Sequence, residues 1–289
     1  MKTTKFAKRA VQGFVGTVAA LASCAALATP VTNWFVEVNS GFTSYAPSGV
    51  TGSNFNNTYA ALGGAPSLLS WGTPSGQTPQ SSLGVGASSN GYFSGNFVTN
   101  NPAQNTVELT HANNVLTGGS TTLQSATLTD FITLRSTAPN VGDALTPAAL
   151  LFSINFLETS NDSSCEVSSP VPCNDIFVID VAGAGFNPID NSLNQTFWYD
   201  DGTGLEDYNA ILQIAGLGPL GAAACNAVLG SGVNTACIGF TTVENQFNSF
   251  QVSLRITDTP FVVPEPASLA LVGLALAGLG LRRRKVAAG

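Results

Sequence analysis

The fold class is decided by the stretch FNSFQVSLRIT, residues 247–257. Every second side chain from Phe250 to Ile256 is apolar, and the side chains between them are polar. Successive side chains of an extended chain point to opposite faces, so this alternation places the apolar groups on one face. The stretch therefore predicts a β-strand with one buried face.

Similar segments recur along the chain, and nothing between its two ends has a sustained helical period. The first predicted strand is Trp34–Val38, and the Gly-, Ser-, Asn- and Pro-rich residues that follow, to about Gly91, are predicted to be loops that join short strands. Eight further strands are predicted at Tyr92–Val98, Thr106–His111, Thr122–Leu134, Leu150–Leu157, Asp175–Val181, Thr196–Tyr199, Tyr208–Ile214 and Ile238–Val243. About a dozen short strands separated by turn-forming clusters predict an all-β fold, an antiparallel β-sandwich of the jelly-roll kind.

The first 28 residues predict a secretory signal peptide. Four basic residues lie among the first nine, residues 10–22 are mostly small and apolar, and Ala26-Leu27-Ala28 offers a cleavage site. We therefore expect export through the Sec translocon and cleavage by signal peptidase before Thr29. An alternative is that Leu21-Ala22-Ser23-Cys24 is a lipobox, in which case Cys24 would be lipidated and become the mature N-terminus.

The last 26 residues, 264–289, predict a short membrane anchor. Pro264-Glu265-Pro266 is followed by fifteen uncharged, mostly apolar residues, 267–281, and then by Arg282-Arg283-Arg284-Lys285. A helix of fifteen residues is about 22 Å long, shorter than the roughly 30 Å hydrocarbon core, so the anchor is weak or temporary. The cationic cluster stays on the cytoplasmic side and leaves the preceding residues outside the cytoplasm. The body, residues 29–263, is long enough for one large all-β domain or two small ones, and we expect one domain because no Pro-rich or charged linker marks a boundary.

This order of parts resembles the PEP-CTERM sorting signal of exported Gram-negative bacterial proteins. The resemblance implies that exosortase, an integral-membrane transpeptidase-like enzyme, recognises the tail and removes it near Pro264-Glu265-Pro266. It also implies a transient inner-membrane anchor with the body in the periplasm, followed by release to the cell surface or the extracellular space. An ordinary C-terminal anchor is the alternative.

The body is acidic and contains few charges. Between Thr29 and Val263 there are two basic residues, Arg135 and Arg255, and sixteen acidic ones, a formal charge of about −14. Nucleic acid and anionic membrane surfaces are repelled by such a charge, so neither is an expected partner. A surface of Ser, Thr, Asn and Gly is common in exported adhesive or matrix proteins.

Four cysteines remain in the body after the signal peptide is removed. Their spacing favours disulfides between Cys165 and Cys173 and between Cys225 and Cys237, although four cysteines allow three connectivities. Each bond would close a local loop of about ten residues. A zinc site is the alternative, but neither pair has the gap of zinc ligands and the only histidine is distant in sequence.

That histidine lies in Thr110-His111-Ala112-Asn113. The motif is similar to the one that names the THxN family of PEP-CTERM proteins. Three further segments resemble that family: Trp71-Gly72-Thr73-Pro74, Phe156-Leu157-Glu158-Thr159 and Asp175-Ile176-Phe177-Val178. The resemblance runs from about Trp71 to the tail and implies a location and a fold, but no chemical activity.

We expect His111 to be a packed structural residue. It shares one strand face with Val107 and Leu109, and Asn113-Asn114 can adopt the left-handed turn geometry that ends a strand. One ring nitrogen would then donate to a backbone carbonyl, while Thr110 and Asn113 satisfy turn amides. Ligand or metal binding is an alternative. Catalysis would need a nucleophile elbow such as G-x-S-x-G, which the sequence lacks.

The segment 200–207, DDGTGLED, is a candidate calcium site. Four carboxylates surround two glycines, and Ca²⁺ takes six to eight oxygen ligands from such groups. The candidate ligands are Asp200, Asp201, Glu206 and Asp207. The alternative is a solvated hairpin turn, in which Asp and Gly are simply good turn formers. No other cofactor is expected.

The leading expectation is a non-enzymatic, exported structural or interaction protein of the cell surface or of an extracellular, biofilm-associated polysaccharide matrix. The alternative is a carbohydrate-binding module, for which Trp71, Trp198 and Tyr199 are candidate sugar platforms if they are exposed. A polysaccharide-degrading enzyme would need two carboxylates roughly 5 to 10 Å apart across a cleft.

Overall fold

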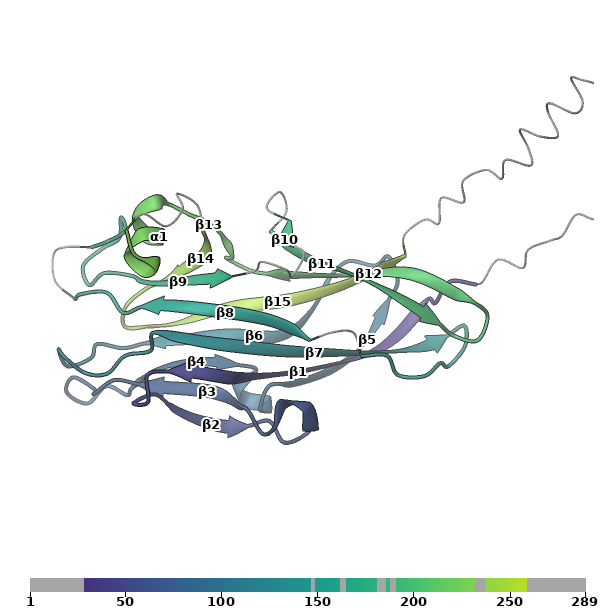
Figure 1. The fold of residues 1–289 in the computed structure, drawn as a ribbon, viewed down its shortest axis with the longest axis horizontal. Coiled ribbons are helices and arrows are strands. Elements are labelled where there is room, and N and C mark those ends of the chain that lie inside the picture. Colours follow the sequence, from purple (N-terminus) through teal and green to yellow (C-terminus); the bar gives the residue numbers. More distant parts are fainter. Residues whose placement is uncertain are drawn as a thin grey trace, which may run out of the picture.

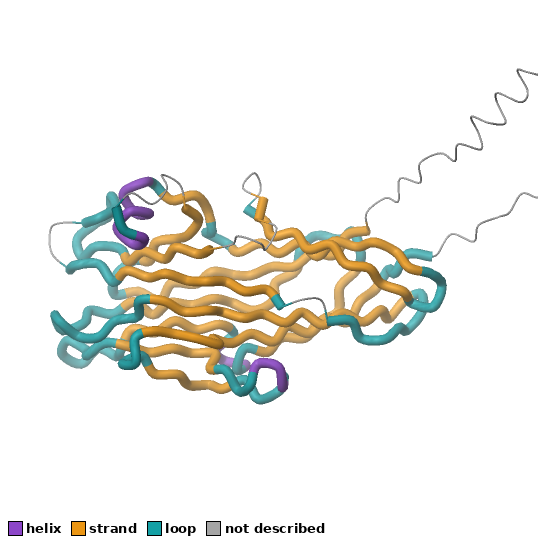
Figure 2. Tube along the Cα trace, in the orientation of Figure 1, coloured by secondary structure: helices purple, strands orange, loops and turns teal. Residues whose placement is uncertain are grey.

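The computed structural model describes residues 29–146, 149–161, 165–180, 186–187, 191–231 and 237–258. They form two antiparallel β-sheets packed face to face in an elongated sandwich (Figures 1 and 2), which confirms the predicted fold class. The predicted signal peptide and the sorting segment 264–289 lie outside these residues. None of the helices in the described ranges has the length and apolar character to cross a membrane.

The first sheet has seven strands in the order β13-β14-β9-β8-β7-β1-β5. Their bounds are β1 Asn33–Ala46, β5 Tyr92–Val98, β7 Ser125–Ala138, β8 Leu150–Leu157, β9 Asp175–Asp180, β13 Gly218–Leu220 and β14 Cys237–Thr242. The predicted strands at 92–98 and 150–157 agree with β5 and β8 residue for residue. The short helix α1, Ala222–Leu229, packs on β8 and β9.

The second sheet has eight strands in the order β10-β11-β12-β15-β6-β4-β3-β2. Their bounds are β2 Thr51–Phe55, β3 Pro66–Trp71, β4 Ser81–Val85, β6 Gln104–Asn113, β10 Phe186–Asn187, β11 Ser192–Asp200, β12 Leu205–Ile214 and β15 Gln246–Asp258. Two single-turn 3₁₀ helices, Ala60–Leu62 and Ala87–Ser89, lie in connecting segments.

The core lies between the sheets and follows the alternation seen in the sequence. On β15, Val252, Leu254 and Ile256 are buried, while Arg255 is exposed. Residues of both sheets form one hydrophobic cluster that runs the length of the sandwich. The strand that decided the fold class therefore contributes its apolar face to the main core, as expected.

The structure extends β1 well beyond the predicted strand Trp34–Val38, to Ala46. The added residues include Asn39, Ser40 and Gly41, which have low strand propensity. They are nevertheless paired, because β7 runs beside β1 as far as Ala46, while the pairing with β5 ends at Asn39. Pairing with a long neighbouring strand outweighs local propensity here.

The helix α1 was not predicted, because its residues AAACNAVL are almost uniformly apolar and show no helical period. It lies over the outer face of β9, where Ala224 forms a small cluster with Ile176 and Val178. β9 is therefore buried on both faces, by the main core on one side and by α1 on the other. Asp175, the first residue of β9, is buried as well.

The sandwich has two distinct ends (Figure 1). At the tail end, the last residue of β15, Asp258, accepts a hydrogen bond from the side chain of Asn100, and Thr32 near the start pairs with Ala138. At the opposite end, β3, β6 and β8 finish and β9 begins. We call this the disulfide end, because the loop between β8 and β9 carries the bond between Cys165 and Cys173.

Candidate functional site

Three carboxylates from separate parts of the sequence meet at the disulfide end. Glu158 directly follows β8, Asp175 is the first residue of β9, and Glu244 lies in the turn from β14 to β15. One carboxylate oxygen of each lies within 4.8 Å of the other two. That turn carries the chain from one sheet to the other, so this acidic cluster sits where the two sheets are joined.

The acidic cluster is largely withdrawn from solvent. Asp175 is 0% exposed and Glu244 is 5% exposed, while Glu158 keeps partial exposure. Burial disfavours the charged form of a carboxyl group, and each group also feels the negative charge of its neighbours. The cluster is therefore an energetically costly arrangement unless something compensates its charge.

Two of the three carboxyl groups use one oxygen to accept hydrogen bonds from the protein. The indole Nε1 of Trp71 donates to Glu158 Oε2 at 3.2 Å. The backbone N–H of Thr159 donates to Asp175 Oδ1 at 2.9 Å, and the Thr159 hydroxyl donates to the same oxygen at 3.3 Å. These donors fix the orientation of both groups.

The other oxygens of the cluster are buried and accept no hydrogen bond from the described residues. They are Glu158 Oε1, Asp175 Oδ2 and both carboxylate oxygens of Glu244. Nearly all buried polar atoms in native proteins have a partner, so four such oxygens in one place need an explanation.

The side chain of Asn113, at the end of β6, completes the site. It is fully buried, and its Nδ2 donates to the carbonyl of Thr242 at 3.4 Å. Burial raises the pKa of Glu244, and the nearby polar groups of Asn113 and of the Asn245 backbone oppose that rise, so the Asn113 side chain lies close to the acidic cluster. The amide oxygen Oδ1 is buried and has no hydrogen-bond partner among the described residues.

Burial dominates the protonation of the cluster. It raises the pKa of Glu158 to about 7, helped by the charge of Glu244 and opposed by the hydrogen bond from Trp71. The pKa of Asp175 is raised well above its usual value by burial and then by the charge of Glu158. At neutral pH the three groups therefore resist full ionisation unless a cation joins them.

His111 packs beside this site and is fully buried. Its ring stacks on Trp71, with centroids 5.6 Å apart and planes 14° apart, and meets Phe177 edge-on at 4.9 Å. Nδ1 shares a hydrogen bond of 2.9 Å with the hydroxyl of Thr242. Burial lowers the pKa of His111 to about 3, so the ring is neutral at physiological pH.

Several details of this region differ from the sequence interpretation. His111 does share a buried face with Val107 and Leu109, but its partner is a hydroxyl group rather than a backbone carbonyl. Asn113 is the last residue of β6 and has no left-handed backbone; Asn245, in the turn after Glu244, has one, with φ 55°. The strand therefore continues where a turn was expected.

The four segments that carried the THxN resemblance converge here, although they are far apart in sequence. Trp71, Glu158 and Asp175 each come from one segment, and His111 and Asn113 come from the motif itself. The sequence alone did not identify the acidic cluster, because Glu158, Asp175 and Glu244 lie in separate segments of the chain. The shared resemblance of the four segments was the signal that could have suggested a common site.

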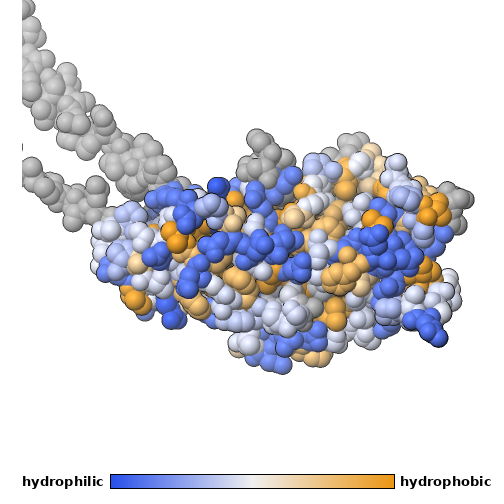
Figure 3. All heavy atoms as spheres, turned by 180° about the vertical axis from the view of Figure 1, so that it is seen from behind, coloured by the Kyte–Doolittle hydropathy of each residue, from blue (hydrophilic) through white to orange (hydrophobic). Residues whose placement is uncertain are grey.

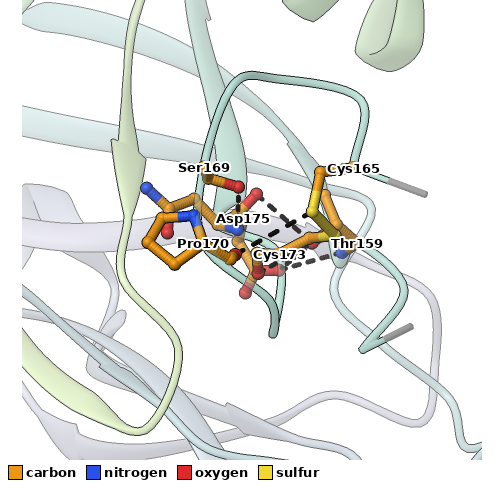
Figure 4. The surroundings of a disulfide bond; sticks show 7 residues. Thr159, Cys165, Ser169, Pro170, Cys173 and Asp175 are labelled. Carbon is orange, nitrogen blue, oxygen red and sulfur yellow. Dashed lines mark hydrogen bonds between the residues drawn. A yellow bond between two sulfur atoms is a disulfide. The ribbon is translucent and has the colours of Figure 1, made fainter. Parts of the chain in front are cut away.

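The first disulfide closes the loop that carries two members of the cluster. Cys165 and Cys173 are bonded, with Cα atoms 5.2 Å apart, and the Thr159 hydroxyl donates to the Cys173 carbonyl at 3.1 Å (Figure 4). Figure 4 shows Thr159 and Asp175 directly beside this bond. The loop is thus held at its base by hydrogen bonds and across its middle by the disulfide.

The second disulfide joins Cys225 of α1 to Cys237 at the start of β14, with Cα atoms 5.7 Å apart. Both predicted pairings are confirmed. The alternative of a zinc site is wrong for these cysteines, because a sulfur in a disulfide is not available as a thiolate ligand.

The segment Asp200–Asp207 forms the hairpin turn between β11 and β12 at the tail end. Asp200 Oδ1 accepts hydrogen bonds from the amides of Gly202 and Gly204, at 2.8 and 3.1 Å. Asp201 Oδ1 accepts from the amide and the hydroxyl of Thr203, at 3.1 and 2.6 Å.

Glu206 in the same hairpin accepts a hydrogen bond from the hydroxyl of Tyr208 at 3.1 Å. Within the described residues, the metal-capable grouping of three side chains is the acidic cluster and does not include this hairpin. Calcium binding by Asp200, Asp201, Glu206 and Asp207 stays a prediction.

Two of the three aromatic candidates for sugar binding are buried. Trp71 is 0% exposed and Tyr199 is 5% exposed, so neither presents a ring face to a ligand. Trp198 is 54% exposed, and it pairs with no other ring in the described part of the chain. Of the three candidate platforms, Trp198 alone is exposed.

The last described strand, β15, ends at Asp258, at the tail end of the sandwich. Residues 262–285 match the family model described as the PEP-CTERM protein-sorting motif. The chain carries an exosortase sorting signal. It is therefore an exported protein that exosortase processes, and the motif serves as a transient C-terminal membrane anchor. No curated protein matches the chain in sequence.

Proposed function

We propose that this exported chain is a non-enzymatic structural or interaction protein of the THxN type, which acts at the cell surface or in an extracellular, biofilm-associated polysaccharide matrix. One observation carries the proposal: the sorting motif begins at residue 262, four positions after β15 ends at Asp258. The whole sandwich lies on the exported side of the anchor, and the short connection supports an orientation with the disulfide end pointing away from the membrane.

The body has properties that suit an extracellular scaffold. Its two disulfides each close a local loop. On the face shown in Figure 3, hydrophobic residues are scattered among hydrophilic ones. A degrading enzyme would present paired carboxylates to a cleft. Asp175 and Glu244 are instead buried, which supports the non-enzymatic proposal.

The sorting part of the proposal is tested by intact mass analysis of protein recovered from a host with active exosortase. The mature chain is expected to begin near Thr29 and to lack the residues beyond about Pro266. A host without exosortase is the control and should keep Arg282–Lys285 on a membrane-bound chain. A basic cluster retained in the active host would contradict processing, and a lipid on Cys24 would contradict cleavage after Ala28.

The matrix part is tested with a labelled exopolysaccharide of the host. Purified protein is expected to retain the polymer and to leave its length distribution unchanged. Shortened polymer would replace the structural proposal with an enzymatic one. A host lacking the protein should form a weaker matrix, and complementation with the full chain should restore it.

A groove on the molecule favours a second candidate function, that of a carbohydrate-binding module. It has a volume of about 450 Å³ and is lined by both aromatic and polar groups. Phe247, which is 69% exposed, lies in it with Tyr92, Phe93, Glu108 and Gln251. Apolar ring faces beside hydrogen-bonding side chains are the combination found in ligand sites of this size.

This second candidate is tested by binding of the same polysaccharide to Phe247→Ala. Retention is expected to fall about tenfold if the groove holds sugar, the size expected when an exposed aromatic contact is lost. Trp198→Ala is the matched control, since it removes a comparably exposed ring outside the groove. A loss in Trp198→Ala alone would move the site to β11, and no loss in either variant would leave the structural role.

A further inference from the structure

The buried oxygens at the disulfide end form a set that lacks a positive partner. Glu158, Asp175 and Glu244 contribute the four carboxylate oxygens that accept no hydrogen bond from the described residues. The two basic side chains of the described ranges, Arg135 and Arg255, are exposed and form no ion pair with the cluster. Buried charges in native proteins are paired or coordinate metals.

The spacing of the cluster fits one shared ion. A carboxylate oxygen of each residue lies within 4.8 Å of the other two. Two oxygens on opposite sides of a Ca²⁺ ion, each bound at about 2.3 to 2.6 Å, are separated by about 4.6 to 5.2 Å, and adjacent ligands lie closer. The three oxygens are therefore close enough for small side-chain rotations to bring them onto one ion.

Asn113 supplies an independent indication of a ligand. Its side chain is fully buried and reaches Glu244 from the other sheet, and its Oδ1 lacks a donor in the described part of the chain. Amide oxygens are ordinary ligands of hard cations. The amide lies close to Glu244, and its buried oxygen without a donor is a group that a cation or its bound water would satisfy.

We propose that Glu158, Asp175, Glu244 and Asn113 form a divalent-cation site, and that the ion is Ca²⁺. The donor set is entirely oxygen, which suits a hard cation. His111 Nε2 is not within reach of all three carboxylates, so the nitrogen ligand that would favour zinc is missing from the set. The partial exposure of Glu158 leaves room for water to complete the six to eight ligands of Ca²⁺.

The ion would connect four parts of the fold. Glu158 and Asp175 bound the disulfide loop, Glu244 lies on the turn between the sheets, and Asn113 belongs to β6 of the second sheet. Trp71 and Thr159 already orient two of the ligands through hydrogen bonds, as outer partners do in metal sites. Calcium in the extracellular medium would lock the disulfide end after export.

The first test is a Ca²⁺ titration of the purified full-length chain, with its disulfides intact and its metal removed by a chelator. One Ca²⁺ per chain is expected by calorimetry and native mass measurement. At 5 mM Ca²⁺ the melting temperature should rise by about 5 °C, for an affinity typical of extracellular calcium modules. No heat of binding together with an unchanged melting temperature would overturn the proposal.

Variants locate the site. Glu244→Gln and Asp175→Asn should each weaken Ca²⁺ binding at least about tenfold, because each removes a charged ligand. The double variant Asp200→Asn with Asp201→Asn is the matched control and should bind Ca²⁺ as the wild type does. Melting of the metal-free proteins shows that each variant is folded. A response that survives in the cluster variants and disappears in the hairpin variant would overturn the proposal.

Terbium luminescence locates the bound ion without replacing any of its proposed ligands. Tb³⁺ binds oxygen ligands as Ca²⁺ does, and it emits when a nearby indole transfers energy to it. Trp71 donates to Glu158 and should be the sensitiser, so Trp71→Phe should lose most of the emission. Trp198→Phe, which alters the indole on the β11 hairpin strand, should keep it. The opposite result would place the ion at the tail end and overturn the proposal.

Discussion

The two ends of the sandwich each hold a group of carboxylates and a buried tryptophan, but they use them differently. At the tail end, Asp200 and Asp201 cap the amides of their own turn, near the ring cluster of Trp34. At the disulfide end, Asp175 and Glu244 are buried with oxygens that no described group satisfies. The dense acidic sequence forms a turn, and the dispersed acidic residues form the candidate site.

This difference shows that the number of carboxylates in a short segment does not predict how many of their oxygens lack a hydrogen-bond partner. A carboxylate next to free backbone amides is satisfied locally, since Asp and Asn readily form such turns. A carboxylate at a strand end, under a helix and against another sheet, has few local donors. Its charge must then be removed by protonation or balanced by a cation.

The largest expected effect comes from the tryptophans. Trp71→Ala should lower the free energy of unfolding by about 3 to 5 kcal/mol, because the ring is fully buried and stacked on His111. Trp34→Ala, the matched change at the tail end, should cost a similar amount. Denaturant unfolding with and without Ca²⁺ distinguishes the two variants, since Trp71→Ala should lose the stabilisation by Ca²⁺ and Trp34→Ala should keep it. A cost below 1 kcal/mol for Trp71→Ala would contradict its place in the core.

The next effect comes from the disulfides. Replacing Cys165 and Cys173 by Ser should lower the free energy of unfolding by about 2 to 3 kcal/mol, as expected for a loop of this size, and should also weaken Ca²⁺ binding. The pair Cys225 and Cys237 is the control, whose replacement should destabilise comparably and leave Ca²⁺ affinity closer to the wild type. Thermal melting and calorimetry measure the two properties. Unchanged affinity in the first variant would separate the disulfide from the cluster.

Asp130 shows the effect of burial on a carboxyl group that does not belong to the acidic cluster. It is a buried carboxyl group on β7. Burial raises the pKa of Asp130 to about 6, against a hydrogen bond from Ser40 that lowers it. The folded state therefore holds the proton of Asp130 more tightly than the unfolded state, so the contribution of this group to stability is complete below about pH 4 and is lost as the pH rises through 6.

Asp130→Asn should remove this dependence. Relative to the wild type, the variant should gain about 2 to 3 kcal/mol between pH 4 and pH 8, whatever constant cost the amide adds. Urea unfolding at several pH values measures the difference. Parallel stability curves for the two proteins would show that this carboxyl group does not titrate as burial requires.

The smallest effects have opposite signs at the two ends. In metal-free protein at pH 8, Glu244→Gln should raise the free energy of unfolding by about 1 kcal/mol, because it removes one buried negative charge from the cluster. Asp200→Asn should lower it by about 0.5 to 1 kcal/mol, because a weaker acceptor caps the turn. Added Ca²⁺ should reverse the first sign and leave the second. If both variants changed the free energy of unfolding of the metal-free protein in the same direction, the proposed difference between the two ends would be wrong.

The sequence predicted well those features of the fold that depend on residues close together in the chain. The alternation of residues 247–257 and the spacing of the cysteines depend on neighbours in the chain, and both agree with the structure. The prediction was weaker where long-range pairing decides. β1 continues to Ala46 because β7 pairs with it along its whole length, and α1 forms from an almost uniformly apolar segment that covers β9.

The sequence by itself determined the class of fold and the sorting signal at residues 262–285, and it favoured the disulfide pairs that the structure confirms, because each depends on residues close together in the chain. Only the tertiary structure decided that Glu158, Asp175 and Glu244 meet, and that Trp71 is buried against them. Residues as far apart in the chain as these are brought together by the packing of two sheets. The chemistry of the disulfide end is therefore a property of the fold, while the destination of the protein is a property of its tail.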